Sequence, residues 1–205
     1  MTAVSLPIRT AALVAAIGLS AVGIAACDSD ETSSGGPTQI QKQSLTSDSQ
    51  QSSTSNIAPL GQANSTMKTQ PVEVPAKLVP VAMRTGTHQG FDRVVIELTG
   101  EGKPGWHIDY VPLPQQQASG QELKVSGDTF LNVNIDGTTY PFEIGVEATD
   151  LPATVGSGPA VAEVISGGTF EGRSQFVIGL KGSPRPYSVS YLEDPKRLVI
   201  DFTEN

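Results

Sequence analysis

The pattern of hydrophobic and polar positions changes near residue 77, and from there to the C-terminus it is typical of β-structure. Short apolar runs are separated by turn residues, and no stretch shows the 3.6-residue period of an amphipathic helix of useful length. So many short strands in about 125 residues predict an all-β domain, a small antiparallel β-sandwich. We predict strands at Val79–Met83, Arg93–Leu98, His107–Val111, Glu122–Val125, Phe130–Ile135, Tyr140–Ile144, Ala160–Ser166, Gln175–Leu180, Tyr187–Leu192 and Arg197–Phe202.

One strand pattern occurs three times. VVIEL (Val94–Leu98) is followed later by FVIGL (Phe176–Leu180) and LVIDF (Leu198–Phe202). The first, third and fifth residues of each copy are apolar, and the two-residue period of a strand turns them all to one face. We predict that this face meets the core, and that the opposite face carries the central valine between polar or small neighbours.

The similarity extends beyond single strands, because Val94–Val111 aligns with Phe176–Leu192 with one gap. Both segments consist of a strand, a Gly/Pro turn, an aromatic residue and a second strand. This internal repeat predicts a strand-turn-strand unit used twice, with a final copy of the first strand closing the domain. The matching positions are Gly100 with Gly182, Trp106 with Tyr187, and Tyr110 with Tyr191.

The N-terminus has the features of a secretory signal. Arg9 precedes an uncharged, apolar run that is too short to span a bilayer comfortably, so we expect residues 1–26 to be a signal peptide. The run ends in Ile24-Ala25-Ala26-Cys27, which resembles the lipobox of bacterial lipoproteins. In those proteins the cysteine becomes the first mature residue and carries a diacylglyceryl group. We therefore expect Cys27 to be the lipid attachment site, on the extracytoplasmic face of the cell membrane.

Residues 27–76 are rich in Ser, Thr and Gln and poor in apolar side chains. Such a segment cannot bury enough surface to offset the entropy of ordering, so we predict a disordered tether. The folded domain is then expected to span residues 77–205.

Charge and cysteine content limit the classes of function that the chain can have. The chain has 13 basic and 21 acidic residues, a net charge of −8, and loss of the signal peptide would make it −9. Because nucleic-acid binding needs a basic surface, we expect no nucleic-acid partner, and membrane contact only through the lipid anchor. Cys27 is the sole cysteine, which excludes an intramolecular disulfide and a cysteine-based metal cluster. The sequence indicates no cofactor.

Two segments resemble a known family. Asp194–Phe202 (DPKRLVIDF) resembles the closing strand of AMIN domains, small β-sandwich modules that target amidases and secretin-type pore proteins to the bacterial cell wall. Thr87–Val95 (THQGFDRVV) resembles the opening motif of the AMIN-like domain of envelope lipoproteins, and Phe170-Glu171-Gly172 fits the same pattern. The resemblance covers roughly Val79 to Thr203. It implies binding to peptidoglycan or another envelope component.

The opening motif contains the first candidate binding site. His88, Asp92 and Arg93 could form a polar cluster at the end of the sandwich that contacts a sugar or a peptide. The alternative, which we favour, is structural: the histidine bonds a loop backbone, and the acid and base orient the strand or pair at the surface.

Aromatic residues at repeat positions form the second candidate. Trp106 and Tyr110, with their counterparts Tyr187 and Tyr191, could stack on sugar rings from one sheet face. Core packing is commoner for aromatics at alternating spacing, and we favour it.

The segment Asn132–Gly137, with Glu143, has the spacing of an EF-hand calcium loop, except that Asn132 stands where aspartate is expected. Alternating Leu131, Val133 and Ile135 instead predict a strand, and Asp136-Gly137 predicts a type I′ hairpin turn. We favour the hairpin and predict no metal site, since His88 and His107 also lack a spacing that would join them in one.

The sequence contains no G-x-S-x-G, H-E-x-x-H or P-loop motif. A hydrolase using Asp92, Glu97 or Asp201 is therefore the less favoured alternative, although the last two acids occupy matching repeat positions. We expect a non-enzymatic binding module for cell-wall polymer or an envelope protein. A scaffold that binds a protein through an exposed sheet edge remains open.

Overall fold

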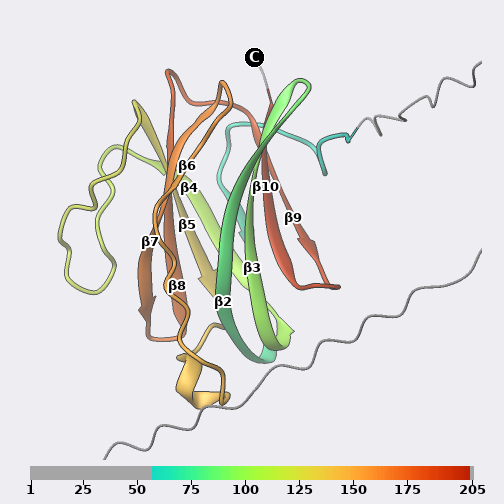
Figure 1. Cartoon of the computed structure of the whole chain (residues 1–205), viewed down its shortest axis with the longest axis vertical. Helices are drawn as coiled ribbons and strands as arrows, with labels where there is room; N and C mark the ends of the chain where they lie inside the picture. Colours follow the sequence, from blue (N-terminus) through green and yellow to red (C-terminus); the bar gives the residue numbers. More distant parts are fainter. Residues whose placement is uncertain (1–56, 204–205) are drawn as a thin grey trace, which may run out of the picture. The chain divides into compact units, whose positions relative to one another are not determined.

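Two antiparallel sheets face each other in the computed structural model, which describes residues 57–203 (Figure 1). The predicted signal peptide, Cys27 and the tether up to residue 56 lie outside the described residues. The described elements are β1 (Lys68–Gln70), β2 (Glu73–His88), β3 (Phe91–Lys103), β4 (Gly105–Val111), β5 (Thr129–Asp136), the 3₁₀ helix η1 (Pro141–Glu143), β6 (Thr154–Val155), β7 (Val161–Phe170), β8 (Arg173–Leu180), β9 (Tyr187–Leu192) and β10 (Arg197–Thr203). The predicted all-β sandwich is confirmed.

The strand order shows that the N-terminal and C-terminal halves of the domain each contribute strands to both sheets. The four-stranded sheet has the order β2-β3-β10-β9, and the six-stranded sheet has the order β1-β4-β5-β8-β7-β6. If β2–β5 are matched with β7–β10 one by one, each strand of the four-stranded sheet has its counterpart in the six-stranded sheet. The predicted repeat, β3–β4 against β8–β9, is part of this pseudo-twofold arrangement. Each copy crosses between the sheets, in opposite directions.

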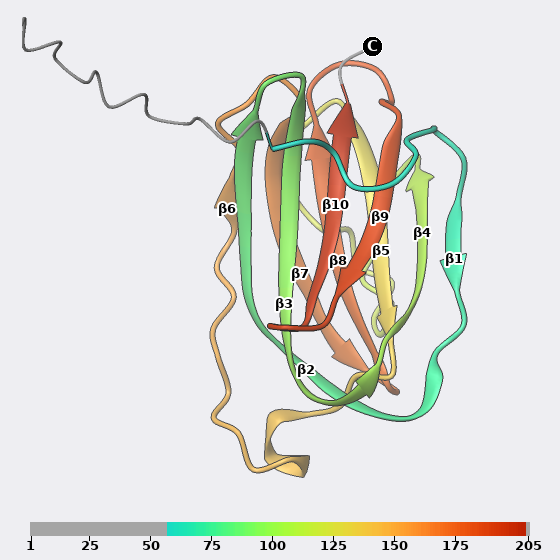
Figure 2. The same ribbon diagram turned by 90° about the vertical axis from the view of Figure 1, so that its right-hand side faces the viewer.

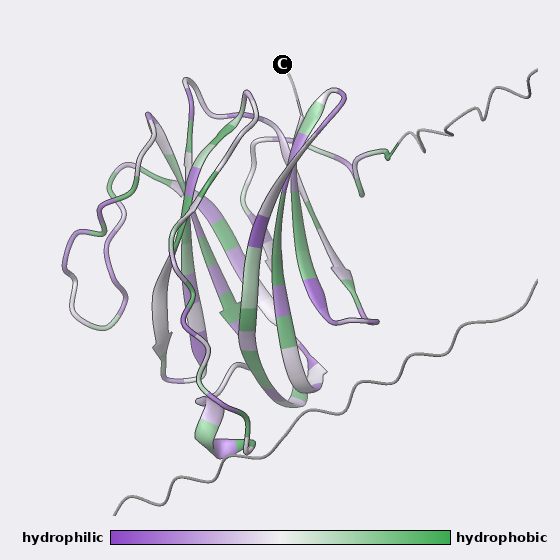
Figure 3. Ribbon diagram, in the orientation of Figure 1, coloured by the Kyte–Doolittle hydropathy of each residue, from purple (hydrophilic) through white to green (hydrophobic). Residues whose placement is uncertain are grey.

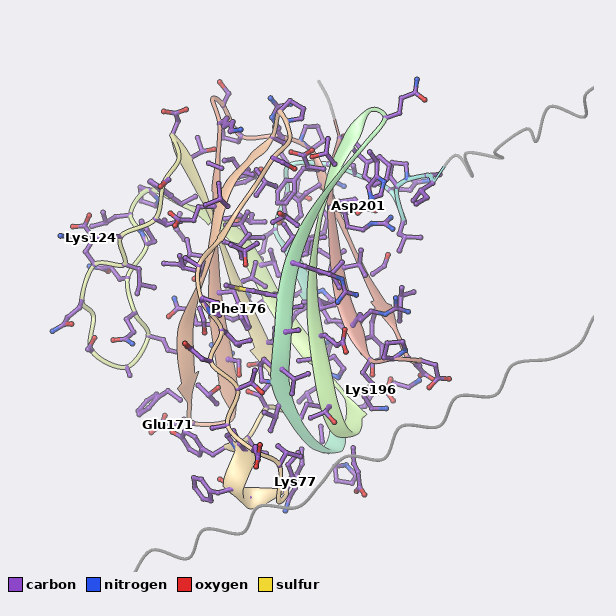
Figure 4. All side chains as sticks on the ribbon, in the orientation of Figure 1. Lys77, Lys124, Glu171, Phe176, Lys196 and Asp201 are labelled. Carbon is purple, nitrogen blue, oxygen red and sulfur yellow. The ribbon has the colours of Figure 1, made fainter. Side chains whose placement is uncertain are left out.

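Alternation along the three similar strands builds the core. Their first, third and fifth residues are at most 3% exposed, as predicted. Figure 3 shows the corresponding alternation of hydrophobic and hydrophilic positions along these strands, and Figure 4 places Phe176 between the two sheets. The core residues from these strands are Val94, Ile96, Leu98, Phe176, Ile178, Leu180, Leu198, Ile200 and Phe202.

The opposite faces of these strands are more covered than the sequence suggested. The central valines Val95, Val177 and Val199 are at most 8% exposed although they point away from the core. Part of the cover over the six-stranded sheet is the β4–β5 loop (112–128). A Cβ on Gly179 would lie 1.9 Å from the carbonyl oxygen of Ser126, so only glycine allows the loop to approach β8 this closely.

The predicted strand Glu122–Val125 is wrong, since these residues belong to the β4–β5 loop. The main chain around Glu122–Val125 pairs within the loop and not with a strand of either sheet. The amide of Gln116 donates to Gln121, and that of Leu123 donates to Pro114. An isolated bridge between Gln115 and Glu122 is the β-pairing that remains.

The predicted strand Tyr140–Ile144 and its Asp136-Gly137 hairpin are also wrong. Strand β5 already has β4 and β8 as neighbours, so a returning strand has no free edge to pair with. The amides of Gly137 and Thr138 instead donate to the Gly172 carbonyl at the β7–β8 turn. Pro141, which lacks an N–H, then begins η1.

The folded domain begins before residue 77, contrary to the expected boundary. A strap (residues Ile57–Asn64) crosses the outer face of the four-stranded sheet, and β1 then pairs with β4 (Figure 2). Sequence analysis missed β1 and β6 because strands of three and two residues show no periodicity. These short strands form the two edges of the six-stranded sheet.

We expect Ile178→Ala to lower the free energy of unfolding by about 2–5 kcal/mol, because this fully buried side chain leaves a cavity between the sheets. Urea denaturation measures the change. Val155→Ala is the control: this valine is 74% exposed, and its loss should change stability by less than about 0.5 kcal/mol. A loss below about 1 kcal/mol for Ile178→Ala would contradict the assigned core position.

Candidate functional site

The predicted cluster of His88, Asp92 and Arg93 does not form. His88 stacks on Phe91 with ring centroids 4.7 Å apart, and the Arg93 guanidinium lies 5.2 Å from the centre of the same ring, all on the outer face of the four-stranded sheet. Asp92 is the neighbour of Arg93 on a strand and therefore points inward. A binding role for these residues stays a prediction.

Asp92 fastens the start of β7. Its carboxylate, 2% exposed, accepts hydrogen bonds from the amides of Ala160 and Val161 at 2.8 and 2.9 Å. A Cβ on Gly158 would lie 1.8 Å from the same carboxylate, so the loop can pass only with glycine at that position. Asp92 therefore has a structural role, which is the alternative that we favoured from the sequence.

The carboxylates considered for hydrolysis lie apart and are each engaged. Glu97 bonds to Arg84 at 2.9 Å, and Asp201 accepts two hydrogen bonds from Arg93 at 2.7 and 2.8 Å. Register places Glu97 opposite Arg197, four residues along the ladder from Asp201, which corresponds to roughly 13 Å. The matching repeat positions therefore do not bring the two acids together.

The repeated aromatic residues pack against the core. Trp106 and Tyr110 lie on the inner face of β4 and are partly buried, while Tyr187 is fully buried on β9. Tyr110 and Tyr187 make an edge-to-face contact at 5.7 Å. Their hydroxyl groups donate to the carbonyls of Arg185 and Ile108. Packing thus accounts for the spacing of these rings.

The residues with calcium-loop spacing form a strand instead of a loop. Asn132, Asn134 and Asp136 lie on the outer face of β5, and Glu143 lies in η1. In the described part of the chain, no group of three or more His, Cys, Asp and Glu side chains could hold a metal ion. Within residues 57–203, no helix is long and apolar enough to cross a membrane.

These asparagines instead belong to a polar surface on the outer face of the six-stranded sheet, called here the polar face. Two rows of side chains run across the strands. Register gives the first row as His107, Asn134 and Gln175, and the second as Asp136, Arg173 and Phe170. Gln117 of the β4–β5 loop borders both rows, with its amide nitrogen 3.0 Å from the Arg173 carbonyl.

Asn134 has an unused acceptor at the centre of the polar face. Its side chain is 9% exposed, and its Oδ1 accepts no hydrogen bond from the described residues. Neighbouring Gln175 is fully engaged, since it donates to Gln115 and Asn132 at 2.8 Å and accepts from the Gln117 amide at 3.0 Å. A buried acceptor without a partner costs about 1–3 kcal/mol, and its burial also keeps this oxygen out of reach of a ligand on the intact surface.

The second row lines a pocket of about 270 Å³. Arg173 donates to Asp136 at 2.6 Å, which fixes both charged groups, and Phe170 is 40% exposed beside them. An exposed aromatic face next to a fixed acid, a fixed base and an amide suits a ligand with apolar C–H faces and hydroxyl or amide edges. The lining residues are Gln117, Asp136, Phe170, Glu171 and Arg173.

A larger pocket of about 460 Å³ lies between β2 and β7, and several of its hydroxyl groups are already paired. Ser174 Oγ donates to Thr138 at 3.0 Å, and it lies 2.7 Å from the Thr169 hydroxyl. The polar face is the better candidate because it combines an exposed aromatic ring with a fixed acid–base pair in one pocket.

Sequence analysis noticed parts of the polar face for other reasons. The asparagines drew attention as calcium ligands, and Phe170-Glu171-Gly172 as a family motif. Arg173, His107 and Gln117 gave no joint signal, because three separate segments supply them. Only the registers of β4, β5 and β8 bring them together.

A known family model matches most of the folded domain. The model of the AMIN-like domain matches residues 78–204. The chain belongs to the AMIN-like domain family. The resemblance noted in the sequence is thereby confirmed. No curated protein and no solved structure matched this chain in the same comparisons.

Burial raises the pKa of the Tyr187 hydroxyl well above its ordinary value. Above pH 10 or so, the unfolded chain releases a phenolic proton that the folded chain keeps, so the free energy of unfolding should fall as pH rises. Urea denaturation between about pH 8 and pH 11 should show a fall that is steeper in the native protein than in Tyr187→Phe, by up to about 1.4 kcal/mol per pH unit. Identical pH dependence would contradict a protonated, buried Tyr187.

Proposed function

We propose that this AMIN-like protein is a lipid-anchored, non-catalytic module of the bacterial cell envelope that binds cell-wall polymer through its polar face. Family membership supports a role in binding peptidoglycan or a related envelope component. The half-exposed ring of Phe170 beside the fixed Arg173–Asp136 pair, in one pocket, is the observation that carries the choice of surface.

The chemistry of the polar face fits a saccharide chain. A pyranose ring has a C–H face that packs on an aromatic side chain, and its hydroxyl and acetamido groups donate and accept hydrogen bonds at its edge. Phe170 supplies the aromatic surface, and the Arg173–Asp136 pair supplies a donor and an acceptor. Held in place by the sheet, these groups lose little entropy when a ligand binds.

Several features support a binding role over catalysis. Asp92, Glu97 and Asp201 each bind their own partner, and the first and third are almost completely buried. Glycoside hydrolysis needs two carboxyl groups on either side of the scissile bond, a geometry that these three acids lack. Within residues 57–203, the edges of the six-stranded sheet are strands of three and two residues, so this sheet offers little to a partner that adds a strand.

Co-sedimentation with purified peptidoglycan sacculi tests the proposal, using the chain from Cys27 to Asn205 expressed without its signal sequence. We expect Phe170→Ala and Arg173→Ala each to weaken binding about tenfold, equivalent to about 1.4 kcal/mol, because each removes one ligand contact from the pocket. Phe142→Ala is the matched control: Phe142 is 78% exposed but lies on η1, outside the polar face.

The outcomes separate the site from the function. If the native chain does not sediment with sacculi at physiological salt, wall binding is wrong. If it sediments and all three variants match it, the chain binds wall polymer elsewhere.

The anchor has its own test in cells. Cys27→Ser removes the thiol that would receive the lipid, so we expect this variant to move from the membrane fraction to the soluble fraction of lysed cells. Retention of the variant in the membrane fraction would contradict acylation at Cys27. Ser29→Ala, two residues away, is the control and should stay with the membranes.

A further inference from the structure

Each sheet binds a segment of main chain on its outer face, and both use the same position of the internal repeat to do so. Arg93 and Gln175 directly precede the matching strands at Val94 and Phe176. Each sits opposite a second polar residue in register, Asp201 for Arg93 and Asn134 for Gln175. The next strands place Ser188 and His107 beside these residues. The two outer rows are therefore pseudo-twofold equivalents.

Both rows bind the carbonyl oxygen of one residue and the amide of the second residue after it. On the six-stranded sheet, Gln175 donates to the carbonyl of Gln115 at 2.8 Å and accepts from the amide of Gln117 at 3.0 Å. On the four-stranded sheet, Arg93 donates to the carbonyl of Ala58 at 3.2 Å, and Asp201 accepts from the amide of Leu60 at 2.6 Å. The same arrangement of side chains thus binds one peptide segment on the outer face of each sheet.

Recognition of the strap uses main-chain atoms. Besides the two contacts above, Ser188 Oγ donates to the Leu60 carbonyl. The side chains of Ala58 and Pro59 are exposed, and Ile57 is 48% exposed. Figure 2 shows this segment crossing over β3, β10 and β9 before the chain reaches β1.

The row under the strap is organised without it. Arg93 and Asp201 keep two mutual hydrogen bonds at 2.7 and 2.8 Å, so removal of the strap leaves no unpaired buried charge. Gly61, with φ of 74°, lies between the Leu60 contacts and the bridge from Asn64 to Tyr187. A glycine in this conformation is a natural hinge at which residues before it can move while β1 stays paired with β4.

We propose that the row of Arg93, Asp201 and Ser188 is a peptide-binding site that accepts the strap of a second copy of this chain, in exchange for its own. The occupant follows from the structure, because the site already binds this segment and every contact can form between copies as it does within one. Segment exchange of this kind links copies without new contacts.

Within one chain the strap competes from a high effective concentration, so the native protein should be predominantly monomeric in dilute solution. Two variants remove this competition in complementary ways. Leu60→Pro removes the amide N–H that donates a hydrogen bond to Asp201, and it leaves the site itself intact. Ser188→Leu fills the place of the Leu60 carbonyl and leaves the strap intact. Both changes lie outside the core, and circular dichroism checks the fold.

Sedimentation velocity of the chains from Cys27 to Asn205 provides the test. The mixture of Leu60→Pro and Ser188→Leu should form a heterodimer at least about tenfold more tightly than either variant pairs with itself, because only the mixture combines a free strap with a free site. The control mixes Ser188→Leu with the double variant, which carries both Leu60→Pro and Ser188→Leu. This mixture contains intact straps but no open site, so it should stay monomeric.

A labelled peptide of residues 57–63 supplies a second measurement by fluorescence anisotropy. It should bind Leu60→Pro at least about tenfold more tightly than the native chain, whose own strap competes. It should not bind the double variant. A mixture that sediments as its separate components, or a peptide that binds the native chain and Leu60→Pro equally, would overturn strap exchange. Neither result depends on wall binding.

Discussion

Reciprocal pairing between the two halves of the domain is the constraint on which the rest of this structure depends. Strand β3 pairs with β10, and β5 pairs with β8, so each half places strands in both sheets. Neither half can bury its apolar residues alone, because its strands face each other across the core only when the other half completes both sheets. The triple occurrence of one strand pattern follows from this, since β3, β8 and β10 are all central strands.

Central strands of a sandwich turn one face inward and leave the other as surface. In this protein the outer positions at one end of the strands are polar and are used to hold backbone. The four-stranded sheet uses a buried acid–base pair, while the six-stranded sheet uses amides. Amides bond without the desolvation cost of charges, and the neighbouring row of this sheet places the exposed ring of Phe170 beside the Arg173–Asp136 pair. That difference makes the six-stranded sheet the more suitable surface for an external ligand.

Membership of the AMIN-like family agrees with a binding module of modest size. The surface proposed for wall polymer has the mixture that saccharide recognition needs, an exposed aromatic ring beside fixed polar groups. Its rigidity comes from strand register and from the ion pair between Arg173 and Asp136. The strap adds a second kind of recognition on the opposite face, directed at a peptide backbone.

The sequence by itself determined most of the strands, their inward faces and the internal repeat, because two-residue alternation is a local property of the chain. It also carried the family resemblance in the segments around Arg93 and Arg197. It failed where pairing decides structure: Tyr140–Ile144 has strand composition, yet β5 has no free edge for it. Likewise, Asp92 and Arg93 are adjacent in sequence and point to opposite faces. Only the tertiary structure decided the polar face and the strap, because strand register brings together side chains from segments up to 141 residues apart, as in the contact from Leu60 to Asp201.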